Sequence, residues 1–144
     1  MSTETIAIAA DHAGLELKRI LAKDLADLGF QVLDLGTDSA SSVDYPDFAD
    51  AMAEALKQGK AKRGVLICGS GIGICMAANR HRHVRAAPCH DGLSARLARA
   101  HNDANVLGLG ARLIGVETAR DCLKAFLTTE FEGGRHERRV AKMS

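Results

Sequence analysis

Short apolar runs alternate with amphipathic segments along the chain, and this alternation is the feature that most constrains the fold. The apolar runs have the length of buried strands, and the segments between them carry apolar residues at helical spacing, as Leu17, Leu21 and Leu25 do. Strands separated by helices pair in parallel, with helices covering both faces of the sheet. The pattern predicts an α/β fold, a three-layer α/β/α sandwich with a five-stranded parallel, Rossmann-like sheet. Strands are expected at 5–10, 30–34, 64–68, 84–87 and 105–109, and helices at 17–28, 48–58, 72–79, 93–101 and 116–127.

Length and composition predict one domain, 1–144, because no linker divides the 144 residues. The net charge is +1 and aromatic residues make up 3% of the chain, so neither bulk attraction to nucleic acid nor base stacking is favoured. No signal segment opens the sequence and no apolar run has the length of a bilayer span. We therefore expect a cytoplasmic protein with no nucleic-acid or membrane partner.

The carboxyl ends of the predicted strands carry the polar residues that suit a binding site. Asp11 and His12 follow the first strand, residues 68–73 follow the third, and residues 110–112 follow the fifth. Ligands of open parallel sheets bind outside the carboxyl ends of the strands. These three segments are therefore predicted to converge on one edge of the sheet.

Cys68 ends the third strand and is followed by Gly69-Ser70-Gly71-Ile72-Gly73, which leads into a predicted helix. Open backbone N–H groups at such a turn stabilise a thiolate and a nearby anion. The segment lacks the full spacing of the dinucleotide fingerprint and lies after the third strand rather than the first. The alternative interpretation is a tight turn needed only for packing.

Other candidates have equally plausible structural explanations. Asp11 can cap the first helix rather than serve in chemistry, and Asp47 is expected to be the N-cap of the second helix after Pro46. Tyr45 can line a pocket. His101 and the neighbouring asparagine close a helix, where a histidine often only complements the helix dipole.

The remaining cysteines and the basic residues between 80 and 83 are expected to be structural. Cys75, Cys89 and Cys122 lack the paired spacing of a zinc site, and in a reducing compartment they should be free thiols in the core. Residues 80–83 are expected to form a solvated turn. Metal binding by His81 and His83 is disfavoured, because the flanking arginines repel cations.

Taken in order, several short motifs make the chain similar to the sugar-phosphate isomerase family that includes ribose-5-phosphate isomerase B and the galactose-6-phosphate isomerase subunits. The resemblance runs from about Ile6 to Val140. It rests on Asp11-His12-Ala13-Gly14, Gly36-Thr37, Asp44-Tyr45-Pro46, Cys68-Gly69-Ser70-Gly71-Ile72-Gly73, Ala77-Ala78-Asn79, His101-Asn102-Asp103-Ala104-Asn105, Gly110-Ala111-Arg112 and Glu132-Gly133-Gly134-Arg135-His136.

The resemblance implies a role for each motif. Cys68 would be the proton-transferring base, since Ile74 stands where some members have a glutamate. The other implied catalytic residues are Ser70, which moves a proton between the substrate oxygens, and Asp11 and His101, which open the furanose ring. Substrate would be bound by His12, Tyr45, Gly69, Gly71, Ile72, Gly73, Ile74, Asn102, Arg112, Arg135 and Arg139, so the basic tail, 128–144, would contribute to the site.

The implied reaction interconverts D-ribose 5-phosphate and D-ribulose 5-phosphate through a cis-enediolate, in the pentose phosphate pathway. It needs no metal and no organic cofactor, and the family's shared sites imply a homodimer or a dimer of dimers. Two alternatives stay open. One is an isomerase of a six-carbon sugar phosphate, such as allose or galactose 6-phosphate, and the other is a non-catalytic sugar-phosphate binding module on the same fold.

Overall fold

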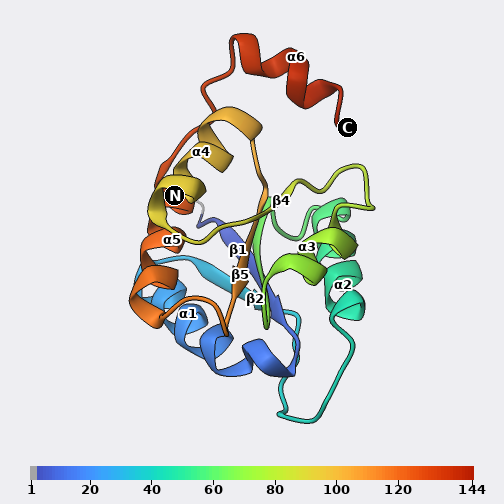
Figure 1. Ribbon diagram of the computed structural model, residues 1–144, viewed down its shortest axis with the longest axis vertical. Coiled ribbons are helices and arrows are strands. Elements are labelled where there is room, and N and C mark those ends of the chain that lie inside the picture. Colours follow the sequence, from blue (N-terminus) through green and yellow to red (C-terminus); the bar gives the residue numbers. More distant parts are fainter. Residues whose placement is uncertain (1–2) are drawn as a thin grey trace.

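The computed structural model describes residues 3–144, and a parallel sheet forms its centre (Figure 1). The five strands lie in the order β2-β1-β3-β5-β4, and every neighbouring pair is parallel. The α/β sandwich expected from the alternating pattern is therefore confirmed. The strands are β1 (Thr5–Ala10), β2 (Gln31–Asp34), β3 (Arg63–Cys68), β4 (Ala86–Pro88) and β5 (Val106–Gly110).

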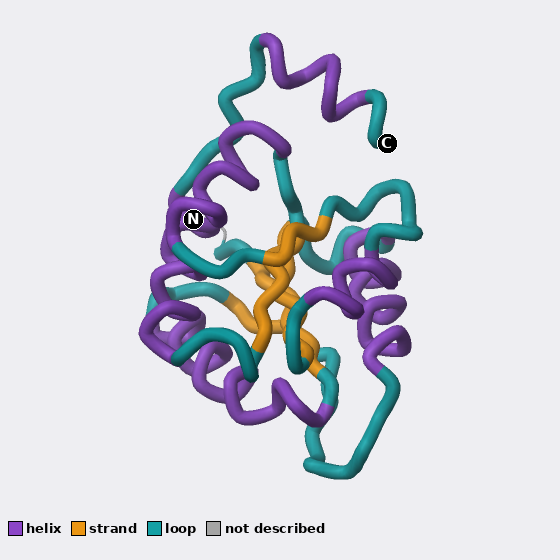
Figure 2. Tube along the Cα trace, viewed as in Figure 1, coloured by secondary structure: helices purple, strands orange, loops and turns teal. Residues whose placement is uncertain are grey.

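Helices cover both faces of this sheet, as Figure 2 shows. The helix α1 begins directly after the short 3₁₀ turn η1 (His12–Gly14). Within the described residues, no helix is long and apolar enough to cross a membrane. The helices are α1 (Leu15–Asp27), α2 (Tyr45–Lys57), α3 (Ile72–Ala78), α4 (Gly92–Asn102), α5 (Val116–Thr128) and α6 (Arg135–Ala141).

Side chains alternate between two cores because successive strand residues point to opposite faces. Ile67 joins the core that packs against α1, α4 and α5. Leu66 and Cys68 join the other core, which packs against α2 and α3. The thiol of Cys68 is thereby directed toward α3, the helix that follows it.

The second helix begins earlier than predicted. Its N-cap is Asp44, so Tyr45 and Pro46 form the first turn and Asp47 lies inside it. The expectation that Asp47 is the N-cap was wrong. Proline suits the first turn because it has a fixed φ and lacks the N–H that would be unpaired there.

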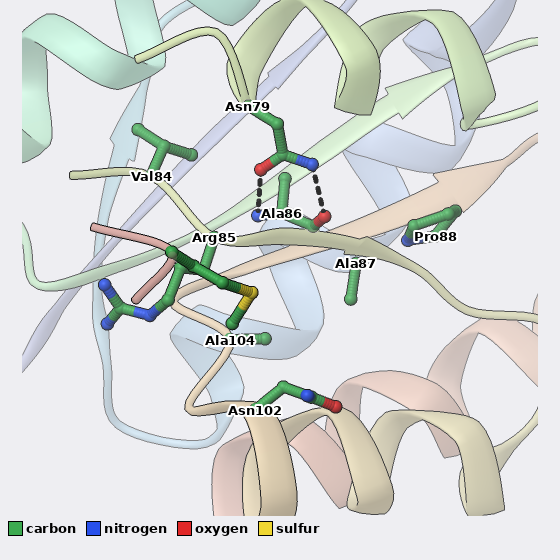
Figure 3. Close-up of a pocket in the computed structure, with 9 residues that line it drawn as sticks. Asn79, Val84, Arg85, Ala86, Ala87, Pro88, Asn102 and Ala104 are labelled. Atoms are coloured by element: carbon green, nitrogen blue, oxygen red, sulfur yellow. Dashed lines mark hydrogen bonds between the residues drawn. The ribbon is translucent and has the colours of Figure 1, made fainter. Parts of the chain in front are cut away.

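Two further elements differ from the predicted pattern. The segment expected as a polar tail contains α6, and β4 begins at Ala86 rather than Val84. The Asn79 side chain holds the start of β4, because it accepts from the Ala86 N–H at 2.7 Å and donates to the Ala86 carbonyl at 2.9 Å (Figure 3). A side chain from the end of α3 thus fixes an edge strand too short to be recognised by its pattern.

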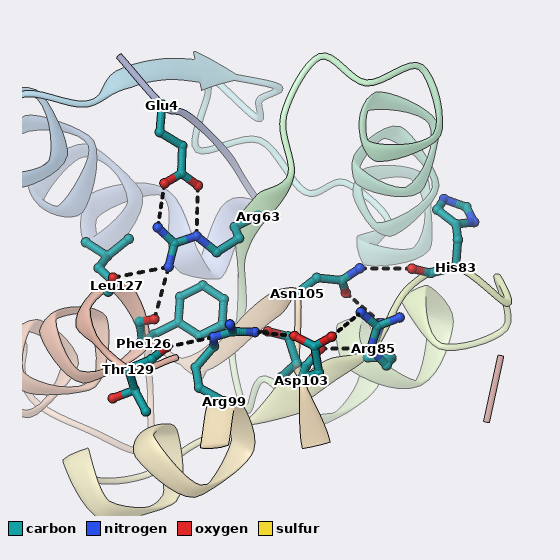
Figure 4. A network of polar contacts seen from close by, with 11 residues as sticks. Glu4, Arg63, His83, Arg85, Arg99, Asp103, Asn105, Phe126, Leu127 and Thr129 are labelled. Carbon is teal, nitrogen blue, oxygen red and sulfur yellow. Dashed lines mark hydrogen bonds and ion pairs between the residues drawn. The ribbon is translucent and has the colours of Figure 1, made fainter. Parts of the chain in front are cut away.

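At the amino edge of the sheet, Arg63 joins segments that are far apart in sequence (Figure 4). Its guanidinium donates two bonds to the Glu4 carboxylate, at 2.6 and 2.8 Å, and two to the Phe126 and Leu127 carbonyls. These bonds lower the pKa of the Glu4 carboxyl. The arginine therefore ties β3 to the N-terminal segment and to the last turn of α5.

We expect Arg63→Met to destabilise the fold by about 2 kcal/mol, because it leaves a carboxylate and two helix-end carbonyls without their donor. Denaturant unfolding at pH 7 measures the change. Since pairing lowers the pKa of Glu4, the loss should be fully present above the ordinary glutamate pKa of about 4.3 and should shrink as the pH falls through the lowered pKa of that carboxyl. The matched control is Arg19→Met, whose exposed pair with Glu16 is expected to be worth less than about 0.5 kcal/mol. Equal losses in the two variants would contradict this account.

Candidate active site

Three strand ends lie side by side at the carboxyl edge of the sheet. Ala10 pairs with Ile67, and Cys68 pairs with Gly110. Asp11 therefore follows β1 next to Cys68, and its N–H donates to the Ile67 carbonyl at 3.1 Å. The predicted convergence at this edge is confirmed. A cleft of about 450 Å³ opens there, lined by Asp11, Tyr45, Cys68, Gly69, Ser70, Gly73, Arg112 and Leu113.

The backbone turn after β3 is directed at the Cys68 sulfur. Gly71 has a φ of +77°, and its N–H donates to Sγ at 3.2 Å. A Cβ on Gly71 would lie 2.8 Å from the Leu109 carbonyl carbon, so the turn requires glycine for both its conformation and its close packing. Ser70 Oγ accepts from the Ile72 N–H at 3.1 Å, which closes the turn. An N–H that donates to sulfur stabilises the thiolate over the thiol.

Two side chains close over the glycines of this turn. The Arg112 guanidinium lies over Gly69, where an added Cβ would be 3.2 Å from its nearest nitrogen. The Tyr45 ring lies against Gly73, where an added Cβ would be 2.7 Å from the ring. Both glycines therefore leave room for the cation and the ring that form the walls of the cleft. Tyr45 lines the pocket, as the sequence suggested.

Asp11 caps a helical turn and also lines the cleft. The side chain is buried, and Oδ1 accepts from the N–H groups of Ala13 at 3.0 Å and Gly14 at 3.3 Å. Both bonds go to one oxygen, so the second carboxylate oxygen is available to a ligand. Helix capping and a role in the site, the two interpretations of Asp11 that the sequence left open, are therefore compatible.

The other three thiols are structural. All four cysteines are free and buried. Burial raises the pKa of Cys75 and Cys122 to about 12 and that of Cys89 to about 11. These three thiols stay protonated at neutral pH and cannot act as bases. Among the cysteines, Cys68 alone lines the cleft.

His12 follows Asp11 but is not among the residues that line the cleft. Its Nδ1 accepts from the Val43 N–H at 3.2 Å, so Nε2 is the ring nitrogen left for a ligand. The turn at residues 80–83 packs more closely than expected, because His81 meets Asp50 at 2.8 Å and His83 meets the Ala53 carbonyl at 2.7 Å. The two rings have separate partners on α2.

The remaining candidate residues lie at the opposite edge of the sheet. His101 and Asn102 end α4, just before β5 begins at the edge where β3 also begins. Asn102 lines a separate cavity of about 430 Å³ beside β4 (Figure 3). Arg135 and Arg139 lie on α6, which Figure 1 shows beyond the end of α4. One chain therefore brings together Asp11, Cys68, Ser70 and Arg112 but not His101, Asn102, Arg135 and Arg139.

The sequence did not point to three residues around these sites. Leu113 lines the cleft, and Glu132 and His136 surround His101. A leucine in a turn carries no recognisable signal. The latter two belong to the motif 132–136, but their sequence gives no sign that they fold back onto α4.

A thiol held by a backbone N–H beside a carboxylate, at the carboxyl edge of a parallel sheet, defines an α/β protein equipped for proton transfer on a small polar ligand. Residues 6–143 match the family model described as Ribose/Galactose Isomerase. The chain belongs to this family.

Individual relatives agree with this assignment. The chain is 44% identical to ribose-5-phosphate isomerase B of Escherichia coli, over 94% of this chain and 91% of that protein. It is 45% identical to D-erythrulose-4-phosphate isomerase of Pectobacterium atrosepticum, over 96% and 92%. It is also similar to a crystal structure of ribose-5-phosphate isomerase B from Mycoplasma genitalium with bound ribulose-5-phosphate, with a TM-score of 0.95, 42% identity and coverage of 99% and 95%.

Proposed function

We propose that this chain is an aldose–ketose isomerase that interconverts D-ribose 5-phosphate and D-ribulose 5-phosphate, a step of the pentose phosphate pathway. The observation that carries the proposal is the Cys68 sulfur beside Asp11, receiving the Gly71 N–H at 3.2 Å. The Escherichia coli relative has this activity in its name, and the product is bound in the Mycoplasma genitalium relative. The four free thiols suit a reducing compartment and support a cytoplasmic location.

Proton transfer follows from the geometry of the turn. The Cys68 thiolate removes the proton from C2 of the open-chain aldose. The carbonyl oxygen on C1 then becomes one of the two oxygens of a cis-enediolate. The resulting thiol returns the proton to C1, while the Ser70 hydroxyl moves a proton between O1 and O2. N–H groups in the first turn of α3 lack helical partners and can stabilise the negative oxygens. Each step uses groups of the chain itself.

We propose that the working enzyme is a homodimer with shared sites. His101, Asn102, Arg135 and Arg139 are needed for ring opening, hydroxyl contacts and phosphate binding, but they lie across the sheet from Cys68. A second copy can supply them to the cleft of the first. Exposed apolar residues beside the cleft, Ile72 and Met76 on α3, support a contact with another chain at this place.

Steady-state kinetics can test which sugar phosphate, by its number of carbon atoms, is the preferred substrate. The relatives include enzymes named for a five-carbon and for a four-carbon sugar phosphate, and the family description includes galactose. Measured side by side, kcat/KM is expected to be highest for ribose 5-phosphate among ribose 5-phosphate, allose 6-phosphate, galactose 6-phosphate and erythrulose 4-phosphate. A higher value for another sugar would reassign the substrate. Binding without turnover of any of them would indicate a sensor.

A further inference from the structure

Three potential metal ligands meet where α6 folds back onto the end of α4. His101 comes from α4, Glu132 from the segment before α6, and His136 from α6. Their ligand atoms all lie within 4.8 Å of one another. The Glu132 carboxylate oxygen Oε1 is 3.8 Å from His101 Nε2 and 3.6 Å from His136 Nε2.

These separations suit a shared ion better than direct contact. Hydrogen bonds between nitrogen and oxygen are about 2.7–3.2 Å long, so the two contacts to the carboxylate are too long. Ligands of tetrahedral zinc, with bonds of about 2.0–2.1 Å, stand roughly 3.3 Å apart. The two distances from the carboxylate to the imidazoles are therefore close to an edge of a zinc coordination shell.

The group is held in place by the surrounding structure. The two imidazole rings stack with centroids 4.4 Å apart and planes 14° from parallel. His136 is 8% exposed, whereas His101 and Glu132 reach solvent. The Glu132 N–H donates to the Ala100 carbonyl at 3.0 Å, which fixes this segment against α4. An ion could enter from solvent, and because the nitrogen lone pairs lie in the planes of the stacked rings, the exposed His101 ring would turn toward the ion on binding.

We propose that His101, Glu132 and His136 form a binding site for Zn²⁺ or a similar divalent transition metal. Two imidazoles and one carboxylate are a donor set that zinc accepts, with a fourth position left for water. The consequence, which rests on the proposed function, is that bound metal inhibits the isomerase. A metal on Nε2 occupies the ring nitrogen of the histidine that is assigned to opening the sugar ring, so the loaded enzyme cannot open the substrate.

Calorimetric titration of Zn²⁺ into the metal-free full-length protein tests the site independently of activity. We expect one ion per chain, and binding at least about tenfold weaker in His136→Gln and in Glu132→Gln, because each removes one ligand. The matched control is His81→Gln, since His81 also faces a carboxylate, that of Asp50, but belongs to no group of three potential ligands found among residues 3–144. Cys68→Ala separates this site from thiol binding. Both controls should bind zinc as the wild type does.

Activity provides the second measurement. Zn²⁺ should inhibit the wild-type enzyme reversibly, with full turnover restored by a chelator, and His136→Gln should require more zinc for the same inhibition. The proposal is overturned if the wild type binds no zinc, or if His136→Gln and Glu132→Gln bind it as tightly as wild type. Loss of binding in Cys68→Ala alone would also overturn it. If the protein had no isomerase activity after a chelator had removed all metal, the proposed function would fail. The binding titration would still test the metal site.

Discussion

Cys68→Ala is expected to lower isomerase turnover at least about 1,000-fold while substrate binding stays close to that of the wild type. A positioned general base contributes about 10²–10⁴ to rate, and here the same sulfur serves both C2 and C1. The side chain is buried and lines the cleft, and its proposed role is at the reacting carbons rather than at the phosphate. Steady-state kinetics together with calorimetric binding of ribose 5-phosphate separates the two effects.

Two further variants make this result specific. Cys68→Ser keeps the size of the side chain but offers a hydroxyl that stays neutral at pH 7, so a similar loss is expected. Cys122→Ala removes an equally buried thiol on α5, away from the cleft, and turnover should remain near wild type. Wild-type turnover in Cys68→Ala would reject this cysteine as the base.

Mixing two inactive variants should restore activity. In a heterodimer of Cys68→Ala and His101→Ala, the proposed arrangement leaves one site with both changes and the other intact, because each chain would contribute only one edge of its sheet to each site. Random reassembly of equal amounts therefore predicts roughly a quarter of wild-type activity for a two-fold symmetric dimer. Co-expression with two different affinity tags, followed by assay of the doubly purified species, measures the rescue directly.

The matched control pairs two variants at the same edge. Cys68→Ala and Asp11→Asn lie side by side in one cleft, so their heterodimer has a defect in both sites and should remain inactive. Activity in this control, or none in the mixture of Cys68→Ala with His101→Ala, would show that sites are not shared as proposed.

The sequence predicted the carboxyl edge of the sheet well because parallel topology fixes it. Cys68 ends a strand, Asp11 and Arg112 lie just after one, and a parallel sheet brings all such positions to one edge. The turn at Gly71 was visible for a local reason, since glycines between a strand and a helix permit the positive φ that a tight turn needs.

The other edge was harder to predict because its residues depend on long-range packing. Nothing local distinguishes the helix at 135–141 from a solvated basic tail, and its fold back onto α4 depends on side chains such as His136 meeting a distant helix. Helix boundaries near Tyr45 shifted because proline is favourable inside a first turn as well as before one. The division of site residues between two edges of the sheet has no local signal in the sequence, because it depends on where the folded chain places the end of α4 and α6.

Exchange of the substrate hydrogen at C2 with solvent deuterium tests the role of Cys68 most directly, because it reports removal of that proton. With saturating ribose 5-phosphate in D₂O, the proton held by the thiol should exchange with solvent before it is returned, so the wild type should introduce deuterium into the sugar. NMR follows this incorporation. Cys68→Ala, still binding the sugar, should introduce none above the uncatalysed rate. Deuterium incorporation by Cys68→Ala at the wild-type rate would contradict the account.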